Sequence, residues 1–332
     1  MENMEDNQTG FQSDLQPGIN ALNARVRQIK HEIAKVVVGQ EQIIDLLLAG
    51  IFTGGHILLE GVPGIAKTLT AKLFARTISV NFSRIQFTPD LMPSDVTGTT
   101  VFNVKTSEFN FSKGPIFANL VLIDEINRAP AKTQSSLFEV MEERQITMDG
   151  NTYPMEFPFL VIATQNPIEQ EGTYRLPEAQ LDRFLFRVKL NYPTLAQEID
   201  ILKKFRNDFS TKALDDVKAV LSPQDLKETQ ELIEKIHIKD EILVYIARLV
   251  DSTRNNGDLV LGASPRASLA ILRASKAIAA MNGRDFVIPD DVKFVAFPVL
   301  NHRVMLTAER EMEGMEAEEV IKEITERLEV PR

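Results

Sequence analysis

One eight-residue stretch restricts the fold of this chain more than any other feature. It follows a short apolar run at residues 56–60 and precedes a segment with helical spacing of apolar residues at 69–75. The stretch itself reads Gly61-Val62-Pro63-Gly64-Ile65-Ala66-Lys67-Thr68. A buried strand, a glycine-containing loop and a helix in this order are typical of a phosphate-binding loop. The sequence therefore predicts an α/β fold that binds a nucleotide where this strand ends.

The chemistry of the loop depends on its backbone and on two side chains. Small residues allow the backbone N–H groups to surround the β- and γ-phosphates, and the N-terminus of the next helix adds a partial positive charge. Lys67 supplies a further positive charge, and the hydroxyl of Thr68 can bind Mg²⁺. Ala66 stands where the usual pattern, G-x-x-x-x-G-K-[ST], has glycine. Its methyl group is tolerable if the residue has a helical φ, and we therefore expect little loss of binding.

The composition excludes several classes of protein. The 332 residues are enough for about two domains. The absence of cysteine rules out disulfides, thiolate metal sites and thiol catalysis. The formal charge of −10 argues against nucleic-acid binding, and no run approaches the ~18 apolar residues of a membrane helix. Because the acidic N-terminus also lacks an apolar signal core, we predict a cytoplasmic protein without membrane insertion.

The chain divides into a tail, an α/β region and a helical region. Residues 1–17 are polar and predict a disordered tail. Residues 18–193 are predicted to form the nucleotide-binding domain, with two hairpin insertions at 101–111 and 145–153. Its further strands are expected near 80–87, 120–125, 159–163 and 184–190. Residues 194–332 have mainly helical periodicity and predict a second, smaller domain.

Two carboxylates at the end of a buried strand form the second informative feature. Asp124 and Glu125 follow the apolar run 120–123. Parallel strands end at the ligand edge of a sheet, so both side chains are expected beside the phosphate loop. One carboxylate there can hold the Mg²⁺ hydration shell, and its neighbour can orient or deprotonate a water molecule. Asn166 follows the strand at 159–163, where its amide could position that water.

Two arginines are candidates for stabilising the charge of a transition state. Arg183 directly precedes the last predicted strand, and Arg266 stands at the predicted start of a helix. An arginine at either place is more often a surface residue or a salt-bridge partner, so their roles depend on the rest of the site. No histidine has metal-ligand spacing; the four are His31, His56, His237 and His302.

Taken together, these motifs resemble those of the AAA+ ATPases and, within them, those of the MoxR family. The resemblance covers about residues 19–330. Its specific parts are Val38-Gly39-Gln40, Gly61 to Thr68, Leu122 to Ala129, Ala163 to Pro167, Leu176 to Phe184 and Gly262 to Arg266. It implies the P-loop AAA+ fold, which is a parallel sheet flanked by helices and followed by a smaller all-helical lid domain. The two hairpins match the insertions of that branch.

The resemblance implies where ATP and Mg²⁺ bind. Thr68 and Asp124 would hold Mg²⁺. Glu125 would be the catalytic base, and Asn166 would be the polar residue called sensor 1. Val38 and Gly39 would lie near the adenine. The full set expected to contact the nucleotide is Val38, Gly39, Gly61, Val62, Pro63, Gly64, Ile65, Ala66, Lys67, Thr68 and Leu69.

The resemblance also implies an assembly and a class of partner. Arg183 would be an arginine finger that reaches a neighbouring subunit, and Arg266 would be sensor 2, acting in its own subunit or across the interface. Arg175 and Arg128 are open as a second finger. MoxR-type proteins resemble ring-forming chaperones, here expected as a hexamer, that remodel partners or assist metal-cofactor insertion. Their usual partners carry a von Willebrand factor A domain.

Four other functions are alternatives to this one. The nearest alternative is the motor subunit of a magnesium-chelatase-like complex. A GTPase is disfavoured because the chain has no Asn-Lys-x-Asp motif for reading guanine. A nucleic-acid motor is disfavoured by the acidic charge and by hairpins without basic tips. A scaffold that does not hydrolyse ATP would need Glu125 or the arginine finger to be lost, and both are present.

Overall fold

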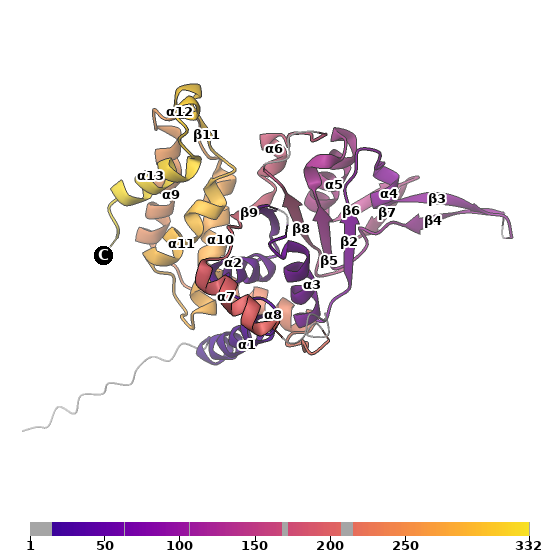
Figure 1. Cartoon of the computed structure of the whole chain (residues 1–332), viewed down its shortest axis with the longest axis horizontal. Coiled ribbons are helices and arrows are strands. Elements are labelled where there is room, and N and C mark those ends of the chain that lie inside the picture. Colours follow the sequence, from indigo (N-terminus) through magenta and orange to yellow (C-terminus); the bar gives the residue numbers. More distant parts are fainter. Residues whose placement is uncertain (1–14, 63, 106, 168–171, 207–214, 332) are drawn as a thin grey trace, which may run out of the picture.

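A five-stranded parallel sheet forms the centre of the structure (Figure 1). The computed structural model describes residues 15–62, 64–105, 107–167, 172–206 and 215–331. In spatial order the strands are β2 (Phe82–Gln86), β5 (Leu120–Asp124), β8 (Leu160–Gln165), β1 (His56–Glu60) and β9 (Phe184–Lys189). Every neighbouring pair is parallel. The predicted α/β fold is confirmed, with strands close to the expected ranges.

Helices cover both faces of this sheet. Successive strand residues point to opposite faces, and both sets are apolar, as is typical of buried parallel strands. Ile57 and Leu59 of β1 belong to one core with residues from α1, α2 and α3, whereas Leu58 lies in a second core with residues from α4 and α5. These helices are α1 (Gln16–Ala34), α2 (Glu41–Phe52), α3 (Lys67–Thr77), α4 (Pro93–Thr97) and α5 (Ala131–Glu143).

Two β-hairpins stand apart from the sheet, as predicted. The first pairs β3 (Gly98–Asn103) with β4 (Glu108–Lys113) and projects away from the body of the molecule (Figure 1). The second pairs β6 (Gln145–Met148) with β7 (Asn151–Pro154). Its turn residues Asp149 and Gly150 both have positive φ, at 51° and 79°, which is the backbone of a type I′ hairpin turn.

The C-terminal part of the chain is mainly helical, as predicted. Its helices are α7 (Leu195–Lys204), α8 (Pro223–Glu234), α9 (Asp240–Arg254), α10 (Pro265–Met281), α11 (Pro289–Leu300), α12 (Ala308–Met312) and α13 (Ala317–Arg327). It also contains a short antiparallel pair, β10 (Leu259–Leu261) and β11 (Met305–Leu306), which the sequence did not predict. Strands of two or three residues are too short to show an alternating pattern. A four-residue helix, α6 (Glu178–Leu181), and a 3₁₀ turn, η1 (Ile126–Arg128), complete the described elements.

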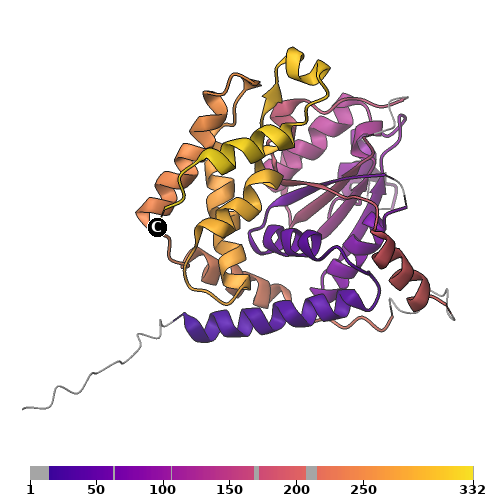
Figure 2. The same ribbon diagram turned by 60° about the vertical axis from the view of Figure 1, so that its left-hand side comes forward.

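The helical part packs directly onto the sheet and its covering helices. One continuous core joins apolar residues of α1, α2 and α3 with those of α8 to α11 and α13. α1 lies along the base of the molecule in Figure 2 and contacts α10, α3 and α8. It begins at Gln16, so the last two residues of the predicted tail are helical; residues 1–14 lie outside the described part of the chain. The domain boundary after residue 193 stays a prediction.

None of the helices in the described ranges combines the length and the apolar character needed to cross a membrane.

Candidate functional site

Three neighbouring strands bring the phosphate loop, Asp124 and Asn166 to one edge of the sheet. β5, β8 and β1 are adjacent and parallel, so their carboxyl ends meet there. Asp124 ends β5, Asn166 follows β8, and the phosphate loop follows β1. The first backbone N–H of the loop, at Gly61, donates to the carbonyl of Gln165, 3.2 Å away. The strand-end argument from the sequence is therefore confirmed for the position of these groups.

The phosphate loop is held close to the sheet at its start and opens at its middle. A side chain at Gly61 would place its Cβ 2.9 Å from the carbonyl oxygen of Leu190, so only glycine fits there. Gly64 has a φ of +87°, and nothing lies within 4 Å of where its Cβ would be. Lys67 begins α3 and donates from Nζ to the carbonyl of Gly61 at 2.5 Å. Pro63, a predicted contact, lies outside the described residues.

Ala66 has a different backbone from the one expected. Its φ and ψ are 60° and 21°, which is the left-handed conformation, so the expectation of a helical φ is wrong. Its carbonyl still accepts the first helical hydrogen bond of α3, from Thr70 N at 2.9 Å. The position needs positive φ, which is why glycine is usual there, and an L residue in this conformation costs about 1–2 kcal/mol.

Asp124 is buried and accepts hydrogen bonds on both carboxylate oxygens. Oδ2 lies 2.6 Å from Nε of Arg84 and 3.3 Å from the hydroxyl of Thr68. Oδ1 lies 3.2 Å from the hydroxyl of Thr164. A carboxylate and a hydroxyl this close are hard oxygen ligands, and Mg²⁺ in proteins is held by one or two such groups together with water and phosphate oxygens. Thr68 and Asp124 therefore fit the metal that was predicted for them.

Glu125 follows directly and has an unusual backbone. Its φ of 58° and ψ of 53° lie in the left-handed region, and its N–H donates to the hydroxyl of Thr164 at 3.0 Å. Its side chain leaves the sheet and is held at Oε2 by Gln86 Nε2 (2.9 Å) and Arg128 Nε (3.0 Å). Non-glycine residues with strained backbones cluster at functional sites, which agrees with the base role predicted for Glu125.

The remaining nucleotide contacts predicted from the sequence occupy two places. Val62 and Leu69 pack against the core on either side of the loop. Gly39, with a φ of +72°, lies against α7: a Cβ there would be 2.4 Å from Nε2 of Gln197. Val38 precedes it and is partly exposed. The structure thus places Val38 and Gly39 beside the first helix after the sheet, and their contact with adenine stays a prediction.

The two predicted charge-stabilising arginines lie together at the opposite edge of the sheet. Arg183 precedes β9, so it stands at the amino ends of the strands, whereas the phosphate loop stands at the carboxyl ends. Nη2 of Arg183 lies 2.7 Å from one carboxylate oxygen of Glu142, and Nη2 of Arg266 lies 3.3 Å from the other. We refer to Arg183 and Arg266 as the arginine pair. Glu142 on α5 holds the pair together within one chain.

The arginine pair lines a cavity of about 290 Å³ with strongly positive walls. Arg144, Arg273 and Arg303 also line it, against the carboxylates of Glu142 and Asp182. His56 is another lining residue, but burial lowers its pKa to about 4, so it is neutral near pH 7. Such a surface suits an anion supplied from outside the chain.

The two alternative finger residues lie elsewhere. Arg128 binds Glu125 and therefore stands at the carboxyl edge, beside the phosphate loop of its own chain. Arg175 has an 85% exposed side chain that lies 3.6 Å from Glu178. Neither of them is grouped with Arg183.

Comparison with known proteins agrees with this arrangement. Residues 56–186 match the sequence profile of the ATPase family associated with various cellular activities (AAA), and residues 251–324 match that of the AAA lid domain. The chain is 43% identical to the chaperone MoxR1 of Mycobacterium tuberculosis over 327 residues, which cover 95% of this chain and 85% of that protein. It belongs to the MoxR family of AAA+ ATPases.

Two further chains are similar to this one over nearly the whole sequence. YeaC of Bacillus subtilis is 44% identical over 321 residues, or 97% of each chain. A crystal structure from Cytophaga hutchinsonii, at 43% identity, superposes with a TM-score of 0.86 and covers 95% of this chain and 98% of its own. Within the helical C-terminal part, residues 251–324 are accordingly the AAA lid.

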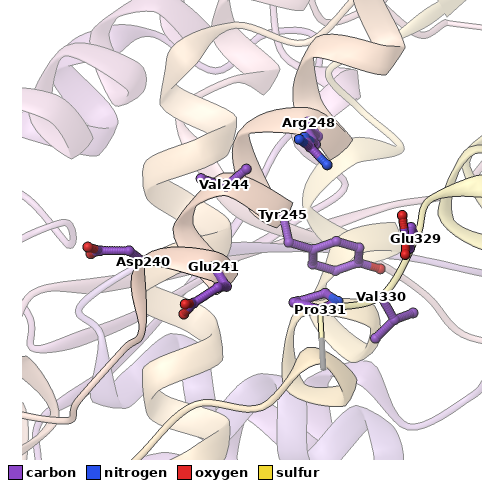
Figure 3. A pocket seen from close by; sticks show the side chains of 8 residues that line it. All are labelled: Asp240, Glu241, Val244, Tyr245, Arg248, Glu329, Val330 and Pro331. Atoms are coloured by element: carbon purple, nitrogen blue, oxygen red, sulfur yellow. The ribbon is translucent and has the colours of Figure 1, made fainter.

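The helical C-terminal part has a separate cavity of about 370 Å³ (Figure 3). It lies between the first turns of α9 and the end of the chain, and its lining residues are Asp240, Glu241, Val244, Tyr245, Arg248, Glu329, Val330 and Pro331. The lining holds three carboxylates and one arginine, so the walls would repel a triphosphate. This cavity is therefore not a second nucleotide site.

Sequence reasoning missed several residues that contact the site. Arg84 and Gln86 lie on β2 and bind Asp124 and Glu125, respectively. Thr164 on β8 binds both the carboxylate of Asp124 and the N–H of Glu125. Arg84 and Gln86 stand two residues apart in a predicted strand and therefore share a face. The strand-end argument that located Asp124 could have included Gln86, which ends β2, but not Arg84 in the middle of that strand.

The backbone of Ala66 gives a prediction about stability. The Ala66→Gly variant should raise the free energy of unfolding by about 1 kcal/mol, because glycine adopts the left-handed region without the Cβ penalty. Urea denaturation of the MoxR protein without nucleotide measures this change. Ala71→Gly, in the helical backbone of α3, is the matched control and should destabilise. A loss of stability in both variants would contradict the left-handed assignment.

Proposed function

We propose that this MoxR-family protein hydrolyses ATP with Mg²⁺ in a ring of its own copies, and acts as a chaperone on partner proteins. The observation that carries the proposal is the division of charged groups between two edges of one sheet. The phosphate loop, Asp124 and Glu125 lie at the carboxyl edge, and the arginine pair lies at the amino edge. Because neither edge has both sets, two copies are needed to complete one site.

Binding of ATP would need the carboxyl edge of a single copy. The backbone N–H groups of the loop and the N-terminus of α3 would hold the phosphates, and Lys67 would exchange the carbonyl of Gly61 for a phosphate oxygen. Mg²⁺, when bound, would neutralise charge on the β- and γ-phosphate oxygens. Thr68 and Asp124 would hold it, and Arg84 would then leave Oδ2 of Asp124.

Hydrolysis would need Glu125 as a base. Within the described residues, Gln86 and Arg128 contact this side chain at Oε2, and Oε1 would accept a proton from water. The oxygen of that water would form a bond to the γ-phosphorus while the bond to the β–γ bridging oxygen breaks, which yields ADP and phosphate. Asn166, 6% exposed at the same edge, would position the water.

The arginine pair of the next copy would stabilise the charge that develops on the γ-phosphate. In the single chain the pair is bound to Glu142, so a phosphate would replace that carboxylate. Placement beside Arg183 supports the role of Arg266 as a sensor 2 that acts across the interface. This placement does not support a role for Arg266 at the phosphate loop of its own chain.

Chaperone activity is supported by the names of relatives and by the projecting hairpin. MoxR1 is named a chaperone. The β3–β4 hairpin exposes Phe102 and Phe109, whose rings pair at 5.0 Å between centroids. Exposed aromatic side chains of this kind are typical of surfaces that bind proteins. We infer a hexamer in the cytoplasm and a partner with a von Willebrand factor A domain, remodelled directly or during metal-cofactor insertion.

The rival functions have less support. The named relatives do not favour a magnesium-chelatase-like motor. A nucleic-acid motor would need a basic surface for the strand, and the formal charge of −10 opposes it. We therefore expect neither DNA nor RNA to stimulate ATP hydrolysis.

The first prediction separates binding from hydrolysis. Lys67→Ala should lose ATP binding, because the ammonium contacts phosphate in the ground state, whereas Glu125→Gln should bind ATP and hydrolyse it very slowly. Fluorescent-nucleotide titration and phosphate release measure the two properties. Ordinary turnover by Glu125→Gln would remove Glu125 from the base role.

The second prediction tests whether two copies complete the site. Arg183→Ala should bind ATP almost normally. Its rate of ATP hydrolysis should be lower by a factor of roughly 10³ to 10⁵, as expected for the loss of an arginine finger. Lys67→Ala is inactive because it does not bind ATP. When the two variants are mixed, activity should return at interfaces where the intact phosphate loop of an Arg183→Ala copy meets the intact Arg183 of a Lys67→Ala copy. At equal mixing these are about a quarter of all interfaces in a head-to-tail ring.

The control for this mixing experiment is Arg175→Ala, which removes an exposed arginine outside the pair. It should hydrolyse ATP at the wild-type rate. If mixed rings form, as native mass spectrometry can show, and no activity returns, the finger is not Arg183. Loss of ATP hydrolysis in Arg175→Ala would indicate that Arg175 is the arginine finger.

The third prediction concerns the projecting hairpin. Replacement of Phe102 and Phe109 by serine should leave basal ATP hydrolysis unchanged and abolish partner capture by a Glu125→Gln trap, as measured by pull-down and mass spectrometry. Phe286→Ser, which changes another exposed phenylalanine on the lid, is the control. Capture of the same proteins by the hairpin variant would show that partners bind elsewhere.

A further inference from the structure

α7 carries an apolar stripe that faces solvent. Leu195, Ile199 and Leu202 are 77%, 42% and 69% exposed, and α7 has no buried residue. Their spacing of four and three residues places them on one face of the helix. We call these three residues the α7 stripe. Figure 2 shows α7 at the outer edge of the molecule.

The opposite side of α7 is attached to the nucleotide-binding part of the chain. Thr194 and Gln197 form a capping box at its start, and Gln197 also lies against Gly39. At its end, Nζ of Lys204 donates to the carbonyl of Ala34, at the end of α1. These contacts fix the rotation of α7 and keep the α7 stripe outward.

The position of α7 places the α7 stripe next to the carboxyl edge of the sheet, where the phosphate loop lies. The chain reaches α7 from the carboxyl end of β9, and the carbonyl of Leu190 on the way lies next to Gly61 of the loop. The stripe therefore begins at the border of the edge that needs arginines from another copy. A copy that supplies them must come close to α7.

α10 offers a complementary face at the arginine edge. Arg266, Leu269 and Arg273 are spaced by three and four residues and share one side of α10. Leu269 is 53% exposed and lines the same cavity as the arginine pair. We call Arg266, Leu269 and Arg273 the α10 face. It combines an exposed apolar group with two cations.

The charges beside the two surfaces have opposite signs. Glu198 lies between Leu195 and Leu202 on α7, at helical spacing from each. Within the described part of the chain, neither Glu198 nor Arg273 forms an ion pair. Apolar contact with opposite charge at the rim is the pattern of a specific protein interface.

We propose that the α7 stripe packs against the α10 face of the next copy in the ring, with Glu198 opposite Arg273. The inference rests on the proposed function, since it assumes a neighbour that supplies the arginine pair. A head-to-tail ring joins two different surfaces of the same chain, as this contact does. The contact would tie the position of Arg266 to the helix that borders the nucleotide.

The first test measures assembly separately from catalysis. In a Glu125→Gln background with ATP, Leu202→Glu should raise the protein concentration needed for half-assembly at least about tenfold, because a charge replaces a buried contact. Light scattering across a dilution series gives this value. Fluorescent-nucleotide affinity of the single copy should stay within about twofold. Leu243→Glu, an exposed leucine on α9, is the control and should assemble normally.

The second test identifies the partner surface. Glu198→Arg and Arg273→Glu should each weaken assembly, and the chain that carries both changes should recover, because every interface then has the reversed pair. A double variant no better than the single variants would overturn the proposal. So would wild-type assembly by Leu202→Glu, or a wild-type protein that stays a single copy at every concentration.

The two proposals can fail separately. A Leu202→Glu protein that assembles and hydrolyses ATP like the wild type would overturn the α7 contact and leave the ATPase function intact. A wild-type protein that assembles through α7, as shown by the charge exchange, but hydrolyses no ATP would overturn the proposed function and leave the contact intact.

Discussion

The parallel direction of the five strands is the constraint on which the site depends. It places every strand's carboxyl end at one edge and every amino end at the other. The phosphate loop, Asp124 and Asn166 gather at the first edge because each follows a strand. Arg183 stands at the second edge because it precedes one. A local change in a loop cannot bring these two sets together across the sheet.

The lid fixes the position of Arg183 through a buried network. Arg303, 8% exposed, donates to the carboxylate of Asp182 at 2.6 Å and to the carbonyl of Phe184 at 2.6 Å. These two acceptors lie on either side of Arg183. His302 lies 3.0 Å from the same carbonyl, and burial keeps its pKa well below the ordinary value, so it stays neutral. The turn that follows α11 thus holds the start of β9, and a shift of the lid would move the arginine.

The parts of the site that could be predicted from sequence are those fixed by a strand and its next residues. The loop, Asp124 and Asn166 belong to this class, because the apolar run and the polar residue after it are adjacent. Arg84 and Glu142 escaped prediction because their partners, Asp124 and the arginine pair, are distant in sequence. Ala66 was assigned the wrong backbone since alanine favours the helical region, and here the loop overrides that preference. The edge reached by Arg266 depends on how α10 packs, which no local pattern encodes.

The ion pairs that hold the arginine pair are weak enough to be exchanged. The side chains of Arg183, Arg266 and Glu142 are 29%, 59% and 38% exposed, so water screens their contacts. Exposed ion pairs contribute about 0–1 kcal/mol each. A trans arginine stabilises the transition state of phosphoryl transfer by roughly 4–7 kcal/mol. In the proposed ring, release of both arginines from Glu142 would therefore cost less free energy than one of them would contribute at a neighbour's γ-phosphate. Glu142 holds the pair in the single copy, and these weak ion pairs would not prevent its transfer.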